Sequence, residues 1–302
     1  NLKKSKFTTA GKAICIYSEG PKAYNLNVEE CEFTSSNPAT DKAAIQMHSE
    51  WGIWGNVNIT KSTATGFAAV NGGLWNDIKN GTPAVPNNKF NVTVDGEVAQ
   101  VAGLTLVAGY KALATNAEGE YCLFNTQSIA DWHDFAQANL YTKTHGVTYK
   151  LLNDIDAKGY VWESMWLSES RNGMVIDGNN HTISNLVTNG GLFGGTASGY
   201  NGTAAVVKNL TFANLSTVSG HWNAAIWGAL YGDITLENVK VVDSELTGKC
   251  NVGAFIAGAA NENFNKHTVI FKDCQVLNSK LVGEGYASQD PTGASGFMGR
   301  AF

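Results

Sequence analysis

The chain repeats itself at a fixed offset, and this repetition limits its possible folds more than any other feature. Residues 13–19 read AICIYSE and residues 44–50 read AIQMHSE, while LNVEECEF at 26–33 returns as VNITKSTA at 57–64. The offset is 31 residues in both pairs. A unit of this length cannot close a core alone, so neighbouring repeats must stack. The offset therefore predicts a solenoid.

A second set of repeats fills the C-terminal half, where an alternating stretch is followed by a Gly-bounded apolar box. The alternating stretches are MVIDGNNHTI, AVVKNLTFANL, ITLENVKVVDS and VIFKDCQVLNS, and the boxes are GLFG at 191–194, AIWG at 225–228, GAFIAG at 253–258 and GFMG at 296–299. The box aromatics Phe193, Trp227, Phe255 and Phe297 are 34, 28 and 42 residues apart. We expect loops of different lengths to interrupt a shared coil.

Within each coil the apolar residues alternate with polar ones, as Ile234 and Leu236 do with Glu237 and Lys240 nearby. Alternation with a period of two indicates short strands that bury one face. Glycine at 33 residues and charged residues at 16% also favour a turn-rich β protein. We therefore predict an all-β fold, a right-handed parallel β-helix (β-solenoid) in two segments.

One segment of the chain has helical periodicity. In TQSIADWHDFAQANL at 126–140, Ile129, Trp132 and Phe135 recur at helical spacing, and Ser128 followed by Asp131 resembles a capping box. We predict a short amphipathic helix near 128–140 that caps a solenoid end. The domains are then a first β-helix at 1–115, truncated at its N-terminus and closing with a strand, DG turn and strand in KFNVTVDGEVAQ, and a second β-helix at 120–302.

The stretch VIDGNNHTISNL at 175–186 gathers enough polar residues to suggest a catalytic cluster. It belongs to the repeat, however, and a catalytic cluster should be peculiar to one coil. We interpret residues 177–180 as a tight turn and His181 as an outward residue on the next strand. Asn185, Asn209, Asn238 and Asn278 should occupy turns, because asparagine tolerates the left-handed region.

These motifs together resemble those of GLUG-motif proteins. The resemblance consists of EYCLFNTQSIADWHDFAQ, YKLLNDIDAKGYVW, VIDGNNHTISNL and GLFG, in order and spacing, and covers residues 120–302. GLUG-motif proteins are adhesin-like parallel β-helix surface proteins of gut Bacteroidetes. The resemblance implies an extracellular or cell-surface location, attached to the outer membrane of a Gram-negative bacterium, and binding rather than catalysis. Residues 1–115 match less closely, and GLWNDIKNG at 73–81 departs from the box.

Charge and motif content exclude several classes of function. With a net charge of −5 and only Arg171 and Arg300 as arginines, nucleic acid is an unsuitable partner. No apolar run is long enough for a transmembrane segment. The five cysteines show no metal-type spacing, and no nucleotide-binding or triad motif occurs. We expect no cofactor and no metal, with Asp154 and Asp156 as the weak candidates for calcium or for acid chemistry.

The tryptophans are the better functional lead, because indole presents a large rigid face to a sugar ring. Trp51 and Trp54 occupy the Gly-containing turn SEWGIWGN, Trp162 and Trp166 the stretch YVWESMWLSES, and Trp222 lies beside His221 in SGHWNAA. These six residues are our candidate ligand contacts. We hypothesise that Trp162, Trp166 and Trp222 line one glycan-binding face.

The sequence favours a non-enzymatic protein for adhesion or carbohydrate recognition, with a glycan or a host or cell-surface protein as partner. Two alternatives stay open. A polysaccharide lyase or glycoside hydrolase is suggested only by analogy of fold. A structural stalk element would need no ligand.

Overall fold

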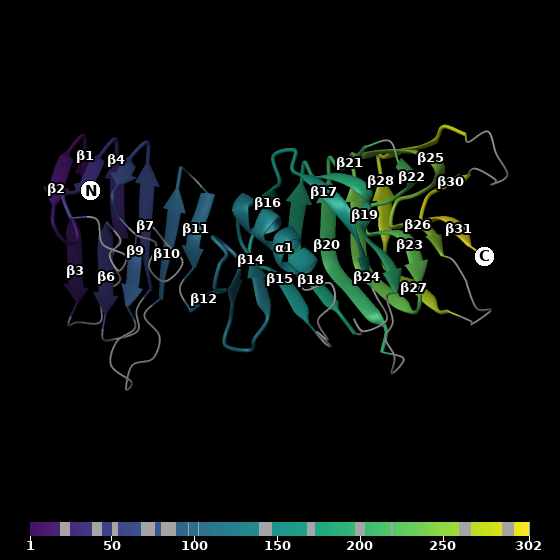
Figure 1. Ribbon diagram of the computed structural model, residues 1–302, viewed down its shortest axis with the longest axis horizontal. Helices are drawn as coiled ribbons and strands as arrows, with labels where there is room; N and C mark the ends of the chain where they lie inside the picture. The colour runs from purple at the N-terminus through teal and green to yellow at the C-terminus, as the bar shows by residue number, and fades with distance from the viewer. Residues whose placement is uncertain are drawn as a thin grey trace. The chain divides into compact units, whose positions relative to one another are not determined.

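The computed structural model describes residues 1–18, 25–37, 44–49, 54–67, 76–79, 89–95, 97–101, 103–138, 147–167, 173–196, 203–218, 220–259, 267–285 and 293–301. It is a β-solenoid with one helix in this part of the chain, which confirms the predicted fold class (Figure 1). The chain divides into two compact units, Asn1–Gly119 and Glu120–Phe302. Each unit is described by itself below.

The first unit winds through three sheets, one on each side of the coil, and its successive coils pair in parallel. The first sheet holds β1 (Leu2–Lys3), β4 (Asn25–Glu29), β7 (Trp54–Thr60), β10 (Lys89–Val94) and β11 (Glu97–Val101), the second β2 (Lys6–Thr9), β5 (Glu32–Ser35) and β8 (Thr63–Thr65), and the third β3 (Ile14–Ser18), β6 (Ile45–Ser49) and β9 (Asn76–Lys79). A short antiparallel pair, β12 (Thr105–Leu106) and β13 (Ala114–Thr115), follows.

The register of this unit confirms the repeat read from the sequence. Ile14 pairs with Ile45 and Asn25 pairs with Asn56, both across the predicted offset of 31 residues. Strands β10 and β11 form the predicted antiparallel hairpin, with Asp95 in the left-handed region at φ 50°.

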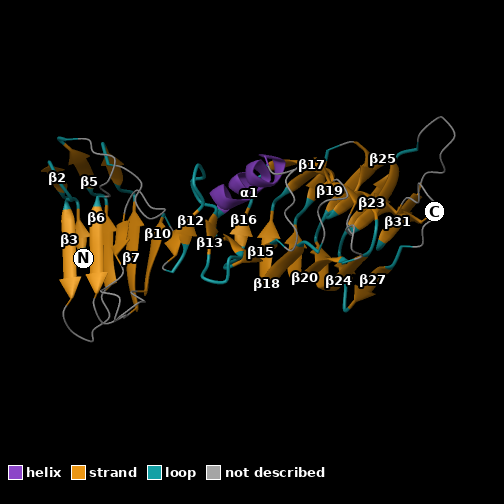
Figure 2. Cartoon of the chain, turned by 60° about the horizontal axis from the view of Figure 1, so that its bottom comes forward, coloured by secondary structure: helices purple, strands orange, loops and turns teal. Residues whose placement is uncertain are grey.

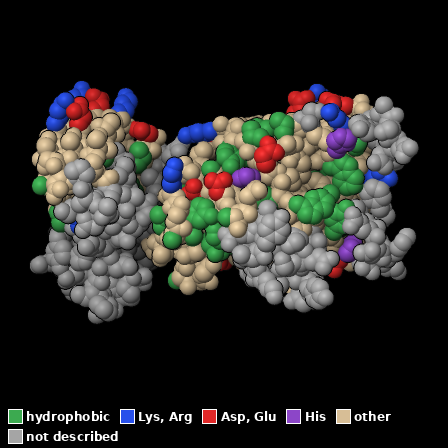
Figure 3. Space-filling view, in the orientation of Figure 1, with side chains coloured by type: hydrophobic (Ala, Val, Ile, Leu, Met, Phe, Trp, Pro, Cys, Tyr) green, Lys and Arg blue, Asp and Glu red, His purple; other side chains and the backbone are tan. Residues whose placement is uncertain are grey.

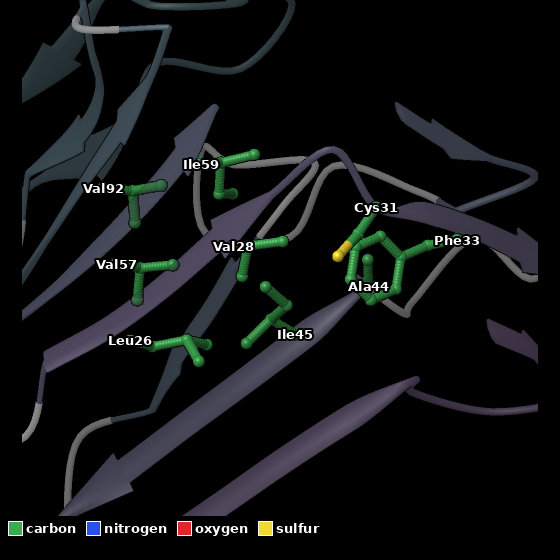
Figure 4. Packing of buried hydrophobic residues seen from close by; sticks show 9 residues of the cluster. All are labelled: Leu26, Val28, Cys31, Phe33, Ala44, Ile45, Val57, Ile59 and Val92. Atoms are coloured by element: carbon green, nitrogen blue, oxygen red, sulfur yellow. The ribbon is translucent and has the colours of Figure 1, made fainter. Parts of the chain in front are cut away.

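Alternation along each strand fills the core of the first unit. In β4, Leu26 and Val28 point inward while Asn25 and Asn27 are exposed. The inward residues of successive coils stack on one another, as Figure 4 shows for the buried cluster Leu26, Val28, Cys31, Phe33, Ala44, Ile45, Val57, Ile59 and Val92. Burying one such aliphatic side chain contributes about 1.5–3 kcal/mol, so the core depends on the register.

The second unit has two principal parallel sheets. The first holds β14 (Tyr121–Leu123), β15 (Thr148–Leu151), β16 (Ile155–Asp156), β18 (Val175–Ser184), β20 (Ala205–Ala213), β24 (Ile234–Val242), β27 (Val269–Lys272) and β28 (Gln275–Leu277). The second holds β17 (Val161–Leu167), β19 (Val187–Thr196), β21 (Ser216–Thr217), β22 (Gly220–Asn223), β23 (Trp227–Tyr231), β25 (Glu245–Gly253), β26 (Ile256–Ala259), β29 (Lys280–Gly283), β30 (Gly293–Ser295) and β31 (Met298–Ala301).

Asparagines turn the chain at the corners of these coils, as the sequence predicts. Asn185, Asn209, Asn238 and Asn278 all have positive φ, between 49° and 55°. The Asn238 side-chain amide donates a hydrogen bond to the Asn209 side-chain oxygen at 3.1 Å. The corner residues therefore form a ladder that links one coil to the next.

The stretch that resembles a catalytic cluster is one of these corners. Asn179 and Asn180 lie in the left-handed region, at φ 51° and 65°, and the Asn179 N–H donates to the Asp177 carboxylate at 2.9 Å. The register of β18 against β20 shifts between Asp177 and His181, which accommodates the turn. His181 is half-buried, and its Nδ1 lies 3.2 Å from the Asp154 carboxylate.

The apolar boxes stack, but not in the register that their aromatics suggest. Phe193 pairs with Trp227 as expected, whereas Trp227 pairs with Ile256 and Ile256 pairs with Met298. Trp227 is thus one residue out of register with Phe255, whereas the pairing of Ile256 with Met298 keeps the 42-residue spacing between Phe255 and Phe297. Phe255 still contacts Phe297, with ring centroids 5.3 Å apart.

Helix α1 (Thr126–Ala138) covers the exposed edge of β17, as Figure 2 shows. Its Trp132 is fully buried, with its ring centroid 5.2 Å from that of Tyr149 and 4.6 Å from that of Trp162. His133 Nε2 lies 3.1 Å from the backbone carbonyl oxygen of Glu163, which would otherwise face solvent at the sheet edge. Covering a sheet edge blocks association through its unpaired backbone groups.

The helix begins two residues before the predicted start, because Asn125 and not Ser128 is the N-cap. The Ser128 N–H donates to the Asn125 side-chain oxygen at 2.9 Å, and the Asn125 N–H donates to Ser128 Oγ at 3.1 Å. This reciprocal pair is a capping box in which serine replaces the usual glutamate. Asp131, which we expected to complete the box, instead accepts a hydrogen bond from Gln127 at 2.9 Å.

Candidate functional site

A hollow of about 440 Å³ opens on the outer surface of the second sheet of the second unit. Its described lining comes from strands β17, β19, β22 and β23. The lining residues are Ser164, Trp166, Gly190, Gly194, Trp222, Gly228, Ala229 and Tyr231. Figure 3 shows hydrophobic side chains gathered on this face over β23.

Small residues make the floor of the hollow because the aromatic rings lie directly on the strands. A Cβ atom on Gly194 would lie 3.0 Å from Cε3 of Trp166, and one on Gly258 would lie 2.7 Å from Cζ3 of Trp222. The Trp166 ring therefore lies over β19 and the Trp222 ring over β26. Between these two strands runs β23, which contributes only Gly228 and Ala229 to the floor.

The walls of the hollow are aromatic. Trp166 is 60% exposed, which is the largest exposure among the large hydrophobic side chains that the structure describes. The ring of Tyr231 packs beside it, with centroids 5.6 Å apart and planes inclined at 58°. Trp222 forms the opposite wall and is half-buried. An exposed indole held in place by a second ring is already ordered before a ligand binds.

The chemistry of the lining favours recognition of an uncharged, amphipathic ring. No described residue in the lining is acidic, basic or a histidine. The polar groups are the Ser164 hydroxyl, the Tyr231 hydroxyl, the indole N–H groups and the backbone of the glycines. Flat aromatic faces with a few hydrogen-bonding groups around them are typical of small-ligand sites.

Of the predicted ligand contacts, the structure brings Trp166 and Trp222 together at this hollow. The prediction for Trp162 is wrong, because its side chain is fully buried and its Nε1–H donates to the Leu192 carbonyl oxygen at 2.9 Å. The register of β17 against β19 shifts between Glu163 and Met165. This irregularity resets the alternation of faces, so Trp162 points into the core and Trp166 points out.

The other predicted contacts lie elsewhere. His221 is exposed, and its Nδ1 lies 3.4 Å from Sγ of the buried Cys250, so it does not line the hollow. Trp51 lies outside the described residues. Trp54 is the first residue of β7, and the structure describes only its backbone.

The two candidate carboxylates both form hydrogen bonds to the next coil. Asp154 accepts a hydrogen bond from the Thr182 N–H at 2.9 Å, and Asp156 accepts hydrogen bonds from the Asn185 side chain and the Lys158 N–H, both at 2.9 Å. These hydrogen bonds, that from Asn185 first, lower the pKa of Asp156 below its usual value of 3.8. Among the described residues, no three His, Cys, Asp or Glu side chains gather as metal ligands.

Sequence reasoning missed Tyr231 and the small-residue floor. Tyr231 follows the AIWG box by three residues, and only the parallel register places it beside Trp166. The last glycines of three boxes carried a signal, because Gly194, Gly228 and Gly258 leave room on the outer face of the sheet. From the sequence those glycines only bound the apolar boxes, whereas in the structure Gly194 and Gly258 make room for indole rings.

Comparison with known proteins adds little to this site. No protein-family model matches the chain, and no curated protein matches it either. The chain is similar to a crystal structure from Bacteroides ovatus that is provisionally assigned as an immunoglobulin A1 protease, with 14% identity over 62% of this chain and 85% of that chain and a TM-score of 0.22. The resemblance to GLUG-motif proteins stays a prediction.

None of the helices in the described part of the chain has the length and apolar character to cross a bilayer.

Proposed function

We propose that this chain is a non-enzymatic carbohydrate-recognition protein, in which the β-solenoid is a rigid scaffold and the hollow between Trp166 and Trp222 binds a sugar ring. The observation that carries the proposal is the pairing of two indoles across a floor of Gly194, Gly228 and Ala229. Carbon-bound hydrogens of a sugar can pack on the indole faces while its hydroxyls meet the groups at the rim. Display of such a site fits the adhesin-like, cell-surface role that the sequence suggests.

The rigidity of the scaffold supports this role. Both walls rest on strands of a continuous parallel sheet, and the Trp166 ring is braced by Tyr231. A preformed site loses little conformational entropy on binding, so a small contact area can still give measurable affinity. Lectin-type affinities of this kind are useful when many copies of a site act together on one surface.

The test is a glycan array probed with the full chain and with Trp166→Ala and Trp222→Ala. Removing a stacking aromatic in a binding site costs roughly 1–4 kcal/mol, so each variant should lose about fivefold or more of the affinity for the glycans that the parent binds. The matched control is Val161→Ala, because Val161 lies on the same strand as Trp166, is 45% exposed and does not line the hollow. Unchanged retention of every bound glycan by both tryptophan variants would refute the proposal.

The same assay separates the alternatives. New reducing or unsaturated ends after incubation with the bound polysaccharide would show that the chain cleaves it, and would support the enzymatic alternative. An array without signal, together with end-to-end association in solution, would favour the stalk.

A further inference from the structure

The floor of the hollow is part of a row of residues that crosses the second sheet of the second unit. Trp166 pairs with Gly194, Ala229 pairs with Gly258, and Gly258 pairs with Arg300. Gly194 lies opposite Gly228 and Ala229, because Phe193 pairs with Trp227 and Gly195 with Leu230. The row therefore runs across β17, β19, β23, β26 and β31. Adjacent strands are about 4.8 Å apart, so the four steps cover roughly 19 Å.

This row is longer than a single sugar ring and ends in a cation. Paired residues on neighbouring parallel strands project to the same face of the sheet, so Arg300 and the ring over Gly258 share the outer face. That ring is Trp222, whose Cζ3, Cε3 and Cη2 atoms come within 2.7–3.3 Å of a Cβ placed on Gly258. Arg300 therefore lies one strand from Gly258, on the face that carries the Trp222 indole, and it is half-buried.

Arginine is the only charged residue in this row, since the other members are Trp166, Gly194, Gly228, Ala229 and Gly258. Figure 3 shows basic side-chain atoms at the C-terminal side of the hydrophobic side chains on this face. A guanidinium group offers a planar fork of donors that matches a carboxylate with two parallel hydrogen bonds. It also packs favourably beside an aromatic ring. The row thus combines ring-stacking surfaces with a carboxylate-matching group at one end.

We infer that the hollow binds an acidic glycan, with a sugar ring between Trp166 and Trp222 and the carboxylate of a neighbouring uronic or sialic acid residue bound by Arg300. This inference rests on the proposed function and names its ligand class. Arg300 sets specificity here, while the aromatic rings supply contact area. The low overall content of arginine makes its position in this row informative, because only two are present in the chain.

The experiment measures binding of the full chain to a panel of uronic acid and sialic acid oligosaccharides, each beside its carboxyl-reduced form. The two members of a pair differ only in whether a carboxylate or a primary alcohol is present. We expect at least one acidic member to bind roughly tenfold or more tightly than its reduced form, as a hydrogen-bonded charge pair supports. Arg300→Gln should abolish that preference and leave the affinity for the reduced form within about twofold, whereas Arg300→Lys should retain part of it.

Lys280→Gln is the matched control, because it removes a cation from the same final coil at a side chain that is 68% exposed and outside the row. It should leave the preference intact. Equal affinity for acidic and reduced forms, or a preference that survives Arg300→Gln, would overturn the inference while leaving carbohydrate recognition in place. If Arg300→Gln lost affinity equally for the acidic and the reduced forms, with circular dichroism and melting unchanged, Arg300 would only support Trp222. That result would also overturn the inference.

Failure of the proposed function would give different binding results from failure of the acidic-glycan inference alone. If no member of the panel and no neutral glycan on the array binds, both proposals fall together. If neutral glycans alone bind and Trp166→Ala removes that binding, only the acidic ligand class is wrong. Preferential binding of sulfated over carboxylated glycans would likewise contradict the carboxylate assignment.

Discussion

At the scale of single residues, the corners of the coils are where side-chain identity is set by the backbone. Asn238 has φ 52°, a region that costs a residue with a Cβ roughly 1–2 kcal/mol and that asparagine tolerates better than most. Its side chain also bonds Asn209 at 3.1 Å. The recurrence of asparagine in the repeats is therefore explained by backbone geometry.

Replacing Asn238 separates the two contributions. Asn238→Ala and Asn238→Gly both remove the amide ladder, but only alanine carries the cost of the left-handed conformation. We expect Asn238→Ala to lower the free energy of unfolding by about 1 kcal/mol more than Asn238→Gly. Urea unfolding followed by circular dichroism measures the difference. Equal stabilities of the two variants would mean that the corner relaxes to an ordinary conformation.

A second residue-scale prediction concerns acid. Hydrogen bonds to its charged form hold the folded-state pKa of Asp156 below 3.8. A carboxylate with a depressed pKa contributes stability that is present above its unfolded-state pKa and is lost as the pH falls through the folded-state value. Asp156→Asn should therefore be less stable than the parent at pH 6, with the difference shrinking below about pH 4. Thermal melts across pH 3–7 check this, and a difference that stays constant would contradict it.

At the scale of elements, the capping box of α1 shows what sequence reasoning could and could not supply. The helical spacing of Ile129, Trp132 and Phe135 predicted the helix itself. The start was misplaced because Ser128 is a common N-cap residue, and serine in the third helical position looks the same in one dimension. Asn125 is the N-cap because its side-chain oxygen accepts a hydrogen bond from the Ser128 N–H. The Ser128 hydroxyl in turn accepts a hydrogen bond from the Asn125 N–H.

The cap can be tested by mutation. Asn125→Ala should reduce the free energy of unfolding by about 1 kcal/mol, and Asn125→Asp should restore most of it because aspartate is an equally good cap. Combining Asn125→Ala with Ser128→Ala should cost less than the sum of the single changes, since each partner loses its function without the other. Strict additivity in this double-mutant cycle would show that the two side chains act independently.

The strands were predicted more fully than the site that they carry. Period-two alternation and the 31-residue offset determine the coil register in the first unit, because a slip of one residue would expose Leu26 and Val28. The opposite orientations of Trp162 and Trp166 depend on an irregularity between Glu163 and Met165 that leaves no mark in the spacing of the tryptophans. The alternation of apolar residues therefore predicts the coil. Whether a side chain near a corner points inward or outward depends on the register between strands, which the sequence does not reveal.

At the scale of the whole molecule, protection should differ along the stack of coils in the second unit. Strand β20 pairs with β18 on one side and β24 on the other, and Val207 and Phe212 within it are buried. The described partner of β27 is β24, and its Ile270 is 46% exposed. Backbone amides with few buried contacts around them open with lower free energy.

Hydrogen exchange measured by mass spectrometry reports this difference. We expect peptides covering β20 and β24 to exchange at least tenfold more slowly than those covering β27, β28 and β29. Uniform protection across all of these strands would show that the final coil is covered in solution.

The second compact unit carries a helix that covers the edge of its first coil. Within residues 120–302, α1 covers the edge of β17, and Trp132 packs against Tyr149 and edge-on against Trp162, so the first coil of that unit buries its own apolar surface. We therefore expect residues 120–302 to fold alone, with Trp132 as the central contact.

Tryptophan fluorescence can follow the unfolding of this fragment. The fragment contains five tryptophans, Trp132, Trp162, Trp166, Trp222 and Trp227, and its signal has no contribution from Trp51, Trp54 and Trp75. We expect the fragment to unfold cooperatively in urea. Trp132→Ala should lower its free energy of unfolding by about 3–5 kcal/mol. A non-cooperative transition, or one that Trp132→Ala leaves unchanged, would mean that the helix does not seal the coil.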